Sequence, residues 1–582
     1  MRYHVLATDY DGTLAHDGRV DAATIESLRK MLATGRRLVM VTGRELPDLM
    51  QTFSEIDLFE WIVAENGGLL YRPSTKEEIP LAAAPADSFL QALHDRHVGP
   101  ISVGRVIVAT WEPHQNAVLE AIRELGLELQ VIFNKGAVMV LPAGINKASG
   151  LQAALKLMHI SEHNVVGIGD AENDHAFLRL CEMSVAVANA LPAVKDTADL
   201  ITQGDHSRGV CQLIDGLVTN DMADLNQQLQ RHHLLLGTAH EEDVKLSPYG
   251  RSVLICGPSA SGKSTVATRI VESLQEQKYQ FCLIDPEGDY SELPGAVVFG
   301  GPQAPPPEDE ILRLLEDPEA NVVVSLTGMP IPDRPPFFLR MLSQLLQMRS
   351  RTGHPHWLIL DEAHHLMPAE WVPPDGTLPK ELTNLVLITV HPELLSATLL
   401  DRVDTVLTVG LNAIETLTSF TRIAKLPAPQ VDAHLMDDPQ PGELLLWLRN
   451  RNAPPEKVRA LPCKMERHRH RRKYAEGQLP PERSFYFRGP DNKLNLRAQN
   501  LMLFLQLGDG IDDETWQYHL HQQDYSRWFR EGIKDENLAS SAERVESLTS
   551  ATPQETRALI RAAVEQDYTL PASLPLPVPG AS

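Results

Sequence analysis

The sequence predicts an α/β protein: a doubly wound parallel sheet with a small α/β insertion, then a second α/β unit, then a small helical module. The main observation is a pattern of short apolar runs that alternate with helically spaced segments and end at acidic or glycine-containing turns. This pattern begins at Tyr3 and begins again at Ser252. The length of 582 residues is also too great for one core and predicts about three domains.

Composition and charge restrict the class of protein. The hydrophobic content of 43% is ordinary for a soluble globular chain. The net charge of −24 argues against a surface devoted to nucleic acid, so nucleic acid is a partner that the charge does not support, although a local basic patch remains compatible. The five cysteines form no Cys-x-x-Cys pair, which predicts reduced thiols in a cytosolic protein. Without a signal-peptide pattern or a membrane-length apolar stretch, we expect a cytoplasmic protein and no membrane contact.

The first apolar run, Tyr3 to Ala7, predicts a buried strand that ends at Asp9-Tyr10-Asp11-Gly12-Thr13. Strand alternation sends the side chains of Asp9 and Asp11 the same way, into the crevice at the carboxyl end of the strand. Two adjacent carboxylates repel each other unless a cation lies between them, and Mg²⁺ prefers such oxygen ligands. The alternative for an isolated Asp-x-Asp pair is a solvated acidic turn.

Later runs in the first 215 residues also stop at polar residues. Arg37 to Val41 leads to Thr42-Gly43-Arg44, and Asn164 to Ile168 leads to Gly169-Asp170. Lys147 precedes a predicted helix. Taken singly, Thr42 and Asp170 fit helix caps and Lys147 fits a surface lysine. Taken together at the strand ends, they fit a site for phosphoryl transfer, because the negative charge of a phosphoryl group needs a cation, a lysine and preorganised donors.

Each residue then has an expected role in this site. Asp9 is the expected nucleophile, and Asp11 is the expected general acid and then base. Thr42 and Lys147 are expected to hold the phosphoryl oxygens, and Asp170 is a second metal ligand beside Asp9.

These motifs, with Gly169-Asp170-x-x-Asn173-Asp174, resemble the haloacid dehalogenase (HAD) superfamily of phosphatases. Glu65-Asn66-Gly67-Gly68 is similar to its Cof-type (type IIB) branch. The resemblance implies a Rossmann-like domain over residues 1–215, a small α/β cap at about 81–141, and a small phosphomonoester as substrate. It also implies an aspartyl-phosphate on Asp9. Mg²⁺ would be held by Asp9, Asp11 and Asp170, with one of the two acids of the first motif contributing its backbone carbonyl and with Asn173 and Asp174 in support.

The second unit opens with the predicted strand Ser252 to Cys256, followed by Gly257-Pro258-Ser259-Ala260-Ser261-Gly262-Lys263-Ser264-Thr265 and a predicted helix. This is a P-loop, whose backbone N–H groups wrap the phosphates of ATP. Lys263 is expected to reach the β and γ phosphates, and Ser264 is expected to ligate Mg²⁺. The expected nucleotide-binding residues are Gly257, Ser261, Gly262, Lys263, Ser264, Thr265 and Asp361.

A second acidic motif distinguishes hydrolysis from transfer to an alcohol. Trp357 to Leu360 predicts a strand that ends at Asp361-Glu362-Ala363-His364, where Asp361 fits the acid that holds Mg²⁺ and Glu362 fits the catalytic base that aligns water. Arg402, or Arg349 and Arg351, would act as a finger on a neighbour's ATP in a homo-oligomer, although surface arginines are the ordinary interpretation.

With Asp285-Pro286-Glu287-Gly288-Asp289-Tyr290, these motifs resemble HerA/FtsK-type ATPases. The resemblance implies a RecA-like P-loop ATPase domain over residues 235–463. The N-terminal barrel of the translocating members has no counterpart here.

The last region carries no catalytic motif. Residues 484–570 predict a small helical accessory module with aromatic core residues, and residues 571–582 are Pro-rich and predict a disordered tail. The basic run at 467–473 fits either a solvated linker or a contact with polyphosphate or nucleic acid.

The sequence therefore predicts a Mg²⁺-dependent HAD phosphatase joined to an ATP-binding and ATP-hydrolysing domain. Three alternatives remain open at this point: a HerA/FtsK-like motor with an accessory HAD domain, a nucleic-acid-processing enzyme similar to polynucleotide kinase-phosphatases, and a degenerate ATPase that only senses nucleotide.

Overall fold

The computed structural model describes residues 1–134, 136–225, 229, 231–258, 261–370, 382–431, 435, 439–449, 454–464, 479, 481–533, 535–548 and 550–568. The basic run at 467–473 and the tail at 571–582 lie outside these residues. The chain forms two compact units, one of residues 1–258 with 273–461 and one of residues 259–272 with 462–582.

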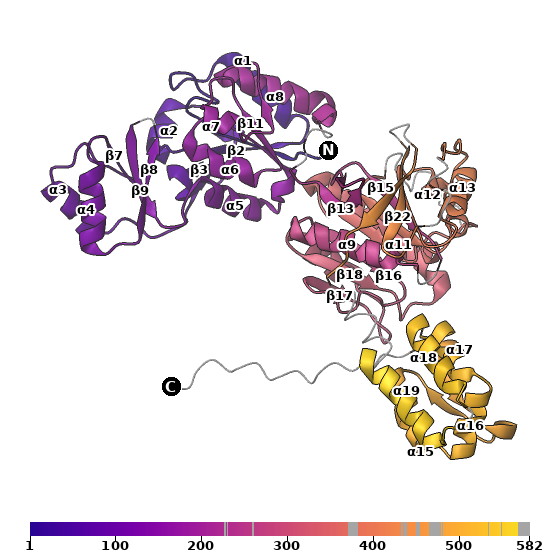
Figure 1. The fold of residues 1–582 in the computed structure, drawn as a ribbon. Helices are drawn as coiled ribbons and strands as arrows, with labels where there is room; N and C mark the ends of the chain where they lie inside the picture. Colours follow the sequence, from indigo (N-terminus) through magenta and orange to yellow (C-terminus); the bar gives the residue numbers. More distant parts are fainter. Residues whose placement is uncertain are drawn as a thin grey trace. The chain divides into compact units, whose positions relative to one another are not determined.

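The first sheet has eight strands in the order β12-β11-β10-β1-β2-β3-β4-β5. Figure 1 labels β11, β2 and β3 of this sheet. From β12 to β3 neighbouring strands are parallel, and β4 and β5 add an antiparallel edge. The strands are β1 (Val5–Thr8), β2 (Arg37–Val41), β3 (Trp61–Ala64), β4 (Leu69–Arg72), β5 (Glu77–Pro80), β10 (Val165–Gly169), β11 (Met183–Ala186) and β12 (Leu200–Ile201). The central strands are apolar throughout because helices cover both faces of a doubly wound sheet.

Six helices accompany this sheet: α1 (Ala22–Leu32), α2 (Leu46–Thr52), α5 (Lys147–Met158), α6 (His175–Leu180), α7 (Pro192–Lys195) and α8 (His206–Asn220). Their apolar faces and the strands form one core, which includes Leu28, Leu151, Phe177 and Leu213. The predicted α/β class of this region is thereby confirmed.

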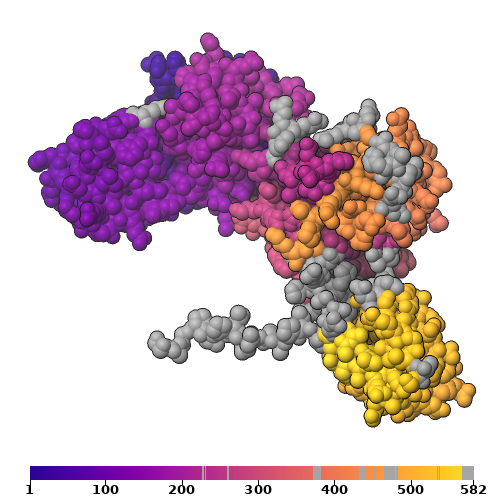
Figure 2. Space-filling model, in the orientation of Figure 1, coloured from indigo at the N-terminus to yellow at the C-terminus, as the bar shows by residue number. Residues whose placement is uncertain are grey.

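The insertion between β5 and α5 is a small α/β cap. Four antiparallel strands lie in the order β6-β7-β9-β8, with bounds Ser102–Val103, Val108–Trp111, Ala137–Pro142 and Leu129–Asn134. Helices α3 (Asp87–Asp95) and α4 (Gln115–Leu125) pack on this sheet through a separate core that contains Phe89, Val118 and Val140. In the space-filling view the cap and the eight-stranded domain form one continuous surface (Figure 2).

The second sheet has eleven strands in the order β14-β13-β23-β22-β21-β15-β20-β19-β16-β18-β17. The strands from β21 to β17 are parallel to their neighbours, and β22, β23, β13 and β14 extend the sheet in antiparallel fashion. Their bounds are β13 (Leu234–Ala239), β14 (Glu242–Leu246), β15 (Ser252–Cys256), β16 (Phe281–Asp285), β17 (Ala296–Phe299), β18 (Asn321–Ser325), β19 (Trp357–Leu360), β20 (Leu385–Thr389), β21 (Thr405–Val409), β22 (Glu443–Leu448) and β23 (Glu456–Ala460).

The helices of this region are α9 (Lys263–Glu276), α10 (Glu308–Leu315), α11 (Arg334–Thr352), α12 (Ala397–Leu400) and α13 (Ala413–Ile423). Helix α11 buries Phe337, Phe338, Met341 and Leu345 in the core of this region, as its helical apolar spacing predicts.

The C-terminal module combines a hairpin with five helices. β24 (Phe485–Phe487) pairs with β25 (Leu496–Ala498), followed by α15 (Leu501–Gly510), α16 (Asp513–His521), α17 (Asp524–Glu531), α18 (Glu536–Glu546) and α19 (Pro553–Tyr568). Leu496–Ala498 pair as a strand, and the Asn500 side chain then caps the helix that follows. The aromatic residues, including Trp516, Tyr525 and Trp528, form the core of the module.

Within the part of the chain that the structure describes, none of the helices has the length and apolar character needed to cross a lipid bilayer.

Candidate active site

The Asp9 motif and the Asp170 motif lie close together because β1 and β10 are parallel neighbours. Thr8 is in register with Ile168, and the backbone N–H of Asp9 donates to the Ile168 carbonyl at 3.0 Å. Asp9 and Asp170 therefore leave the sheet at the same edge, and both are buried.

Lys147 is the buried cation of this site. It is the first residue of α5, whose start is fixed by the Asn146 side chain, an acceptor for the backbone N–H groups of Ala148 and Ser149. The Lys147 side chain is 2% exposed, and its Nζ lies 2.5 Å from Asp9 Oδ1 and 2.6 Å from Asp174 Oδ1. The structure thus places Lys147 against the expected nucleophile.

Asp174 is a buried carboxylate that the sequence placed only in a supporting role. Its Oδ2 accepts from the backbone N–H groups of Asp170 at 2.8 Å and Ala171 at 2.9 Å. Its Oδ1 accepts from Lys147. Asp174 therefore joins the Lys147 side chain to the Asp170 loop.

Burial controls the protonation of these groups. Burial raises the pKa of the Asp9 carboxyl well above its usual value, the neighbouring Asp174 raises it further, and Lys147 opposes both. Burial alone would lower the pKa of Lys147, but Asp174 and Asp9 raise it overall, so this lysine stays charged.

The donor set fits Mg²⁺. Carboxylate oxygens of Asp9, Asp170 and Asp174 all lie within 4.8 Å of one another, and hard oxygen donors are what Mg²⁺ prefers. Thr13 Oγ1 orients Asp170 by donating to its Oδ1 at 3.1 Å. Since Asp174 is held by Lys147 and two backbone N–H groups, Asp9 and Asp170 would be the side chains that hold the ion.

The side chain of Asp11 lies with Arg44 and not with this acidic cluster. Arg44 donates to both carboxylate oxygens of Asp11, at 2.6 and 2.7 Å, and to Asp48 at 2.7 Å. The Asp11 side chain is 39% exposed. This placement leaves the backbone carbonyl as the part of Asp11 suited to a metal.

Thr42 follows β2, the other neighbour of β1, and is fully buried. Its Oγ1 accepts from the backbone N–H of Arg44 at 3.1 Å, which fixes the turn that also carries the Asp11 partner. Asp9, Thr42, Lys147 and Asp170 thus come from adjoining strand ends and the start of α5.

Sequence reasoning used Glu65 only as a family marker and missed its contacts. The buried Glu65 carboxylate accepts from the backbone N–H groups of Arg105 at 2.9 Å, Val106 at 2.8 Å and Ile107 at 3.1 Å, all in the cap. Its φ of 52° is left-handed, a strained conformation that this binding maintains. Glu65 therefore holds the cap to the sheet domain.

We expect Glu65→Ala to lower kcat/KM for 4-nitrophenyl phosphate by about tenfold to a hundredfold, because hydrogen bonds to a charged group contribute about 1.5–3 kcal/mol. Steady-state kinetics measure this effect. Glu77→Ala, which removes an exposed carboxylate from β5, is the matched control and should leave the kinetics unchanged. Equal kinetics for the two variants would contradict the proposed role of Glu65.

Two further residues that the sequence did not single out hold the turn after Asp11. The Gly12 carbonyl accepts from Asn189 Nδ2 at 2.8 Å and lies 2.9 Å from His206 Nδ1. No local pattern marks either residue, because the carbonyl that both contact lies far away in the chain.

The nucleotide motifs are placed on their expected elements. Gly257 directly follows β15, and Asp361 and Glu362 directly follow β19; both strands are parallel neighbours of β20. In the second compact unit, Ser261 and Gly262 precede α9, and Lys263, Ser264 and Thr265 form its first turn. Ser259 and Ala260 lie outside the described residues.

Glu362, the expected base, has a left-handed φ of 39°. Its Oε2 lies 3.4 Å from His364 Nδ1, and the same nitrogen lies 3.3 Å from Thr389 Oγ1 at the end of β20. His364 thus links the expected base to the neighbouring strand, a contact that the sequence did not predict.

One other expectation for this region changes. Arg349 donates to the carbonyl oxygens of Pro355 at 2.9 Å and Thr383 at 3.0 Å within its own chain, so its suggested role as a finger on a neighbour's ATP is wrong. Asp285 holds the turn after β16, because its carboxylate accepts from the backbone N–H groups of Gly288 and Tyr290, both at 2.7 Å. Burial raises the pKa of Asp285 to about 6.

Two family models match parts of this chain. The family model described as haloacid dehalogenase-like hydrolase matches residues 6–117 and 103–214, and a model described as AAA domain matches residues 248–399. The phosphoglycolate phosphatase of Methanothermobacter thermautotrophicus is 31% identical over 218 residues, which cover 36% of this chain and 96% of that protein. Phosphoglycolate phosphatase 2 of Saccharolobus solfataricus is 27% identical over 224 residues, which cover 37% of this chain and 93% of that protein.

Among solved structures, a haloacid dehalogenase-like hydrolase from Bacteroides thetaiotaomicron is 20% identical, with a TM-score of 0.33, over 37% of this chain and 99% of that one. These relatives match a little over a third of the chain, so the eleven-stranded sheet and the C-terminal module extend beyond them.

Proposed function

This chain belongs to the haloacid dehalogenase-like hydrolases, and we propose that it hydrolyses a small phosphomonoester through a phosphorylated Asp9. The observation that supports this most strongly is the buried set of Asp9, Lys147, Asp170 and Asp174 at one edge of the first sheet. We call residues 1–225 the phosphatase half and the region of the eleven-stranded sheet, residues 234–460, the ATPase half.

In the proposed first step, a carboxylate oxygen of Asp9 forms a bond to phosphorus while the bond from phosphorus to the ester oxygen breaks. Asp11 gives a proton to the departing alcohol, and this requires Asp11 to exchange its contact with Arg44 for the substrate. In the second step, Asp11 takes a proton from water, the water oxygen attacks phosphorus, and the bond to Asp9 breaks.

The other residues stabilise charge and hold geometry. Lys147 lies against Asp9 and is placed to offset the charge of the phosphoryl group, with the Thr42 hydroxyl as a further donor. A bound Mg²⁺ would supply charge neutralisation at the carboxylates of Asp9 and Asp170. The Glu65 contact holds the cap to the sheet domain, and the cap is where substrate selection is expected.

The curated relatives make phosphoglycolate the first substrate to test. Purified full-length protein should release phosphate from it and from 4-nitrophenyl phosphate with Mg²⁺ present, and sugar phosphates and nucleotides form the comparison set. Chelation of the metal should abolish the activity, and added Mg²⁺ should restore it. Full activity in the presence of chelator would contradict the metal dependence.

We also propose that the ATPase half binds Mg²⁺ and ATP through the P-loop and hydrolyses ATP with Glu362 as base. Lys263→Ala should abolish binding of a fluorescent ATP analogue, because it removes the charge that meets the phosphates. The same variant should retain hydrolysis of 4-nitrophenyl phosphate, since the phosphatase residues lie elsewhere. Loss of both properties together, in protein that is folded by circular dichroism, would contradict two separate sites. Membership of a homo-oligomer remains a prediction from the sequence, and contact with nucleic acid remains an alternative that the net charge does not support.

A further inference from the structure

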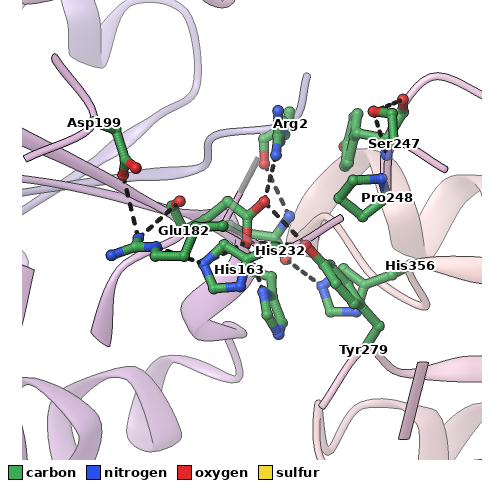
Figure 3. A network of polar contacts seen from close by, with 12 residues as sticks. Arg2, His163, Glu182, Asp199, His232, Ser247, Pro248, Tyr279 and His356 are labelled. Atoms are coloured by element: carbon green, nitrogen blue, oxygen red, sulfur yellow. Dashed lines mark hydrogen bonds and ion pairs between the residues drawn. The ribbon is translucent and has the colours of Figure 1, made fainter. Parts of the chain in front are cut away.

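A buried carboxylate, Glu182, lies where the phosphatase half meets the ATPase half within the first compact unit (Figure 3). The Glu182 side chain is 2% exposed and forms an ion pair with Arg2. It accepts from the Tyr279 hydroxyl at 3.0 and 3.1 Å, and His163 Nδ1 lies 2.7 Å from its Oε2. Arg2, His163 and Glu182 belong to the phosphatase half, whereas Tyr279 belongs to the ATPase half, so one buried charge holds side chains from both.

Three more hydrogen bonds connect the phosphatase half to the ATPase half near Glu182. His163 Nε2 lies 2.8 Å from the Gln277 carbonyl, His354 Nε2 lies 3.0 Å from the His159 carbonyl, and His356 Nε2 lies 3.1 Å from Asn164 Oδ1. The ring of His163 also stacks on that of Tyr279, with 3.8 Å between centroids. We call the Glu182 contacts and these three bonds the joint.

The bond between His356 and Asn164 has a defined direction. His356 Nδ1 accepts from the Gln280 backbone N–H at 2.9 Å, so the proton of the neutral ring lies on Nε2 and is donated to Asn164. Burial lowers the pKa of His356 well below its usual value, which is consistent with this neutral form.

This bond joins two strands at their amino ends. Asn164 immediately precedes β10, which leads to Asp170 of the phosphatase site, and His356 immediately precedes β19, which leads to Asp361 of the nucleotide site. At a rise of about 3.3 Å per residue, β10 spans about 16 Å and β19 about 13 Å. The two acids therefore lie at the far ends of two short buried strands that meet at one hydrogen bond.

The contacts at the joint fit a structural cluster better than a metal site. Atoms of His163, Glu182 and His232 lie within 4.8 Å of one another. However, Glu182 already accepts from Arg2 and Tyr279, and His232 Nε2 accepts from Arg231 Nε at 3.1 Å. A cation would have to displace these donors beside the positive charge of Arg2, so we assign the cluster a structural role.

We propose that the joint couples the two sites, so that nucleotide bound at the Asp361 end of β19 tightens the binding of phosphate at the Asp170 end of β10. The proposal rests on the proposed function for the identity of the two ligands. The physical basis is conformational entropy. The first ligand to bind restricts the motion of its own strand and of the joint. The second ligand then binds beside a strand that is already ordered, so its binding costs less conformational entropy. Because coupling is reciprocal, phosphate must tighten nucleotide binding by the same factor.

The test measures the Kd of a fluorescent, non-hydrolysable ATP analogue on full-length protein with Mg²⁺, with and without inorganic phosphate. We expect phosphate to tighten nucleotide binding by about fivefold or more, the lower end of typical coupling. Direct competition of phosphate for the P-loop would weaken nucleotide binding, so the sign separates the two effects. Lys147→Ala, which removes the phosphate partner in the phosphatase site, should abolish the tightening.

The joint is tested by Tyr279→Phe, which keeps the ring and removes only the hydroxyl that donates to Glu182, and by His356→Phe. Both should reduce the effect of phosphate to less than about twofold, whereas the matched control Tyr71→Phe, a buried tyrosine of β4, should keep the full effect. The proposal would be overturned if phosphate did not tighten binding of the ATP analogue to the wild-type protein. It would also be overturned if phosphate tightened this binding to the full extent in both joint variants. Hydrolysis of 4-nitrophenyl phosphate is measured separately: its absence would contradict the proposed function, while hydrolysis without coupling would contradict the joint alone.

Discussion

Asp9→Asn is expected to lower phosphatase activity by at least about a thousandfold, because the amide is a poor nucleophile and the proposed covalent intermediate cannot form. The change is nearly isosteric, and Lys147 keeps its contact with Asp174, so the fold should survive. Phosphate release from 4-nitrophenyl phosphate measures the loss, and circular dichroism verifies the fold. Binding of an ATP analogue should be unchanged.

The matched control for this variant is Asp17→Asn. Asp17 lies in the loop after the same motif, and its side chain is 93% exposed. The Asp17→Asn variant should retain full phosphatase activity. If Asp9→Asn kept more than about a tenth of the wild-type rate, a water nucleophile without an aspartyl-phosphate would be the better mechanism.

Glu182→Ala is expected to have the largest effect on stability. It leaves the Arg2 guanidinium buried without its ion-pair partner, and removal of one partner of a buried pair costs about 3–5 kcal/mol. Tyr279 and His163 lose their shared acceptor as well. The midpoint of urea unfolding, followed by tryptophan fluorescence, should fall markedly, and the phosphatase half should become more sensitive to limited proteolysis.

Glu120→Ala is the matched control, since Glu120 is exposed on α4 and alanine favours the helix. It should leave the unfolding midpoint within experimental error. Glu182→Gln separates charge from shape, because the amide still accepts from Tyr279 but no longer neutralises Arg2. An unfolding midpoint for Glu182→Ala equal to that of Glu120→Ala would show that the buried ion pair contributes nothing to stability.

The joint connects the phosphatase half with the ATPase half at the amino ends of their strands. The carboxyl ends of both sheets carry the motif residues, while the amino ends of β10 and of β16 and β19 meet at Glu182 and Asn164. The motif residues follow the carboxyl ends of these strands and thus lie at the ends opposite the joint.

Local sequence was sufficient to place the motif residues. In a parallel sheet the carboxyl ends of neighbouring strands share one edge, so apolar runs that end in Asp9, Thr42 and Asp170 predict a common site. The same rule placed Gly257 and Asp361 at the ends of β15 and β19. The helix and strand pattern also predicted the α/β class of both sheets and the small cap.

Local sequence was not sufficient to assign partners to the side chains. The carboxylates of Asp9 and Asp11 were expected on the same side around a cation, yet the Asp11 carboxylate pairs with Arg44 in the turn after β2. Asp174 was expected only as support, yet it binds Lys147, 27 residues away in sequence. Arg349 resembled an exposed finger but donates to carbonyl groups of its own domain.

The sequence by itself therefore predicted where both sets of motif residues lie, because most of them follow apolar runs that become strands of the two sheets. Only the tertiary structure decided how Glu65 holds the cap, how Asn189 and His206 hold the Gly12 carbonyl, and how Glu182 joins the two halves. These contacts connect residues that are 40 to 194 positions apart. No periodicity of 2 or 3.6 residues reports on such pairs, since they form only when separate elements pack.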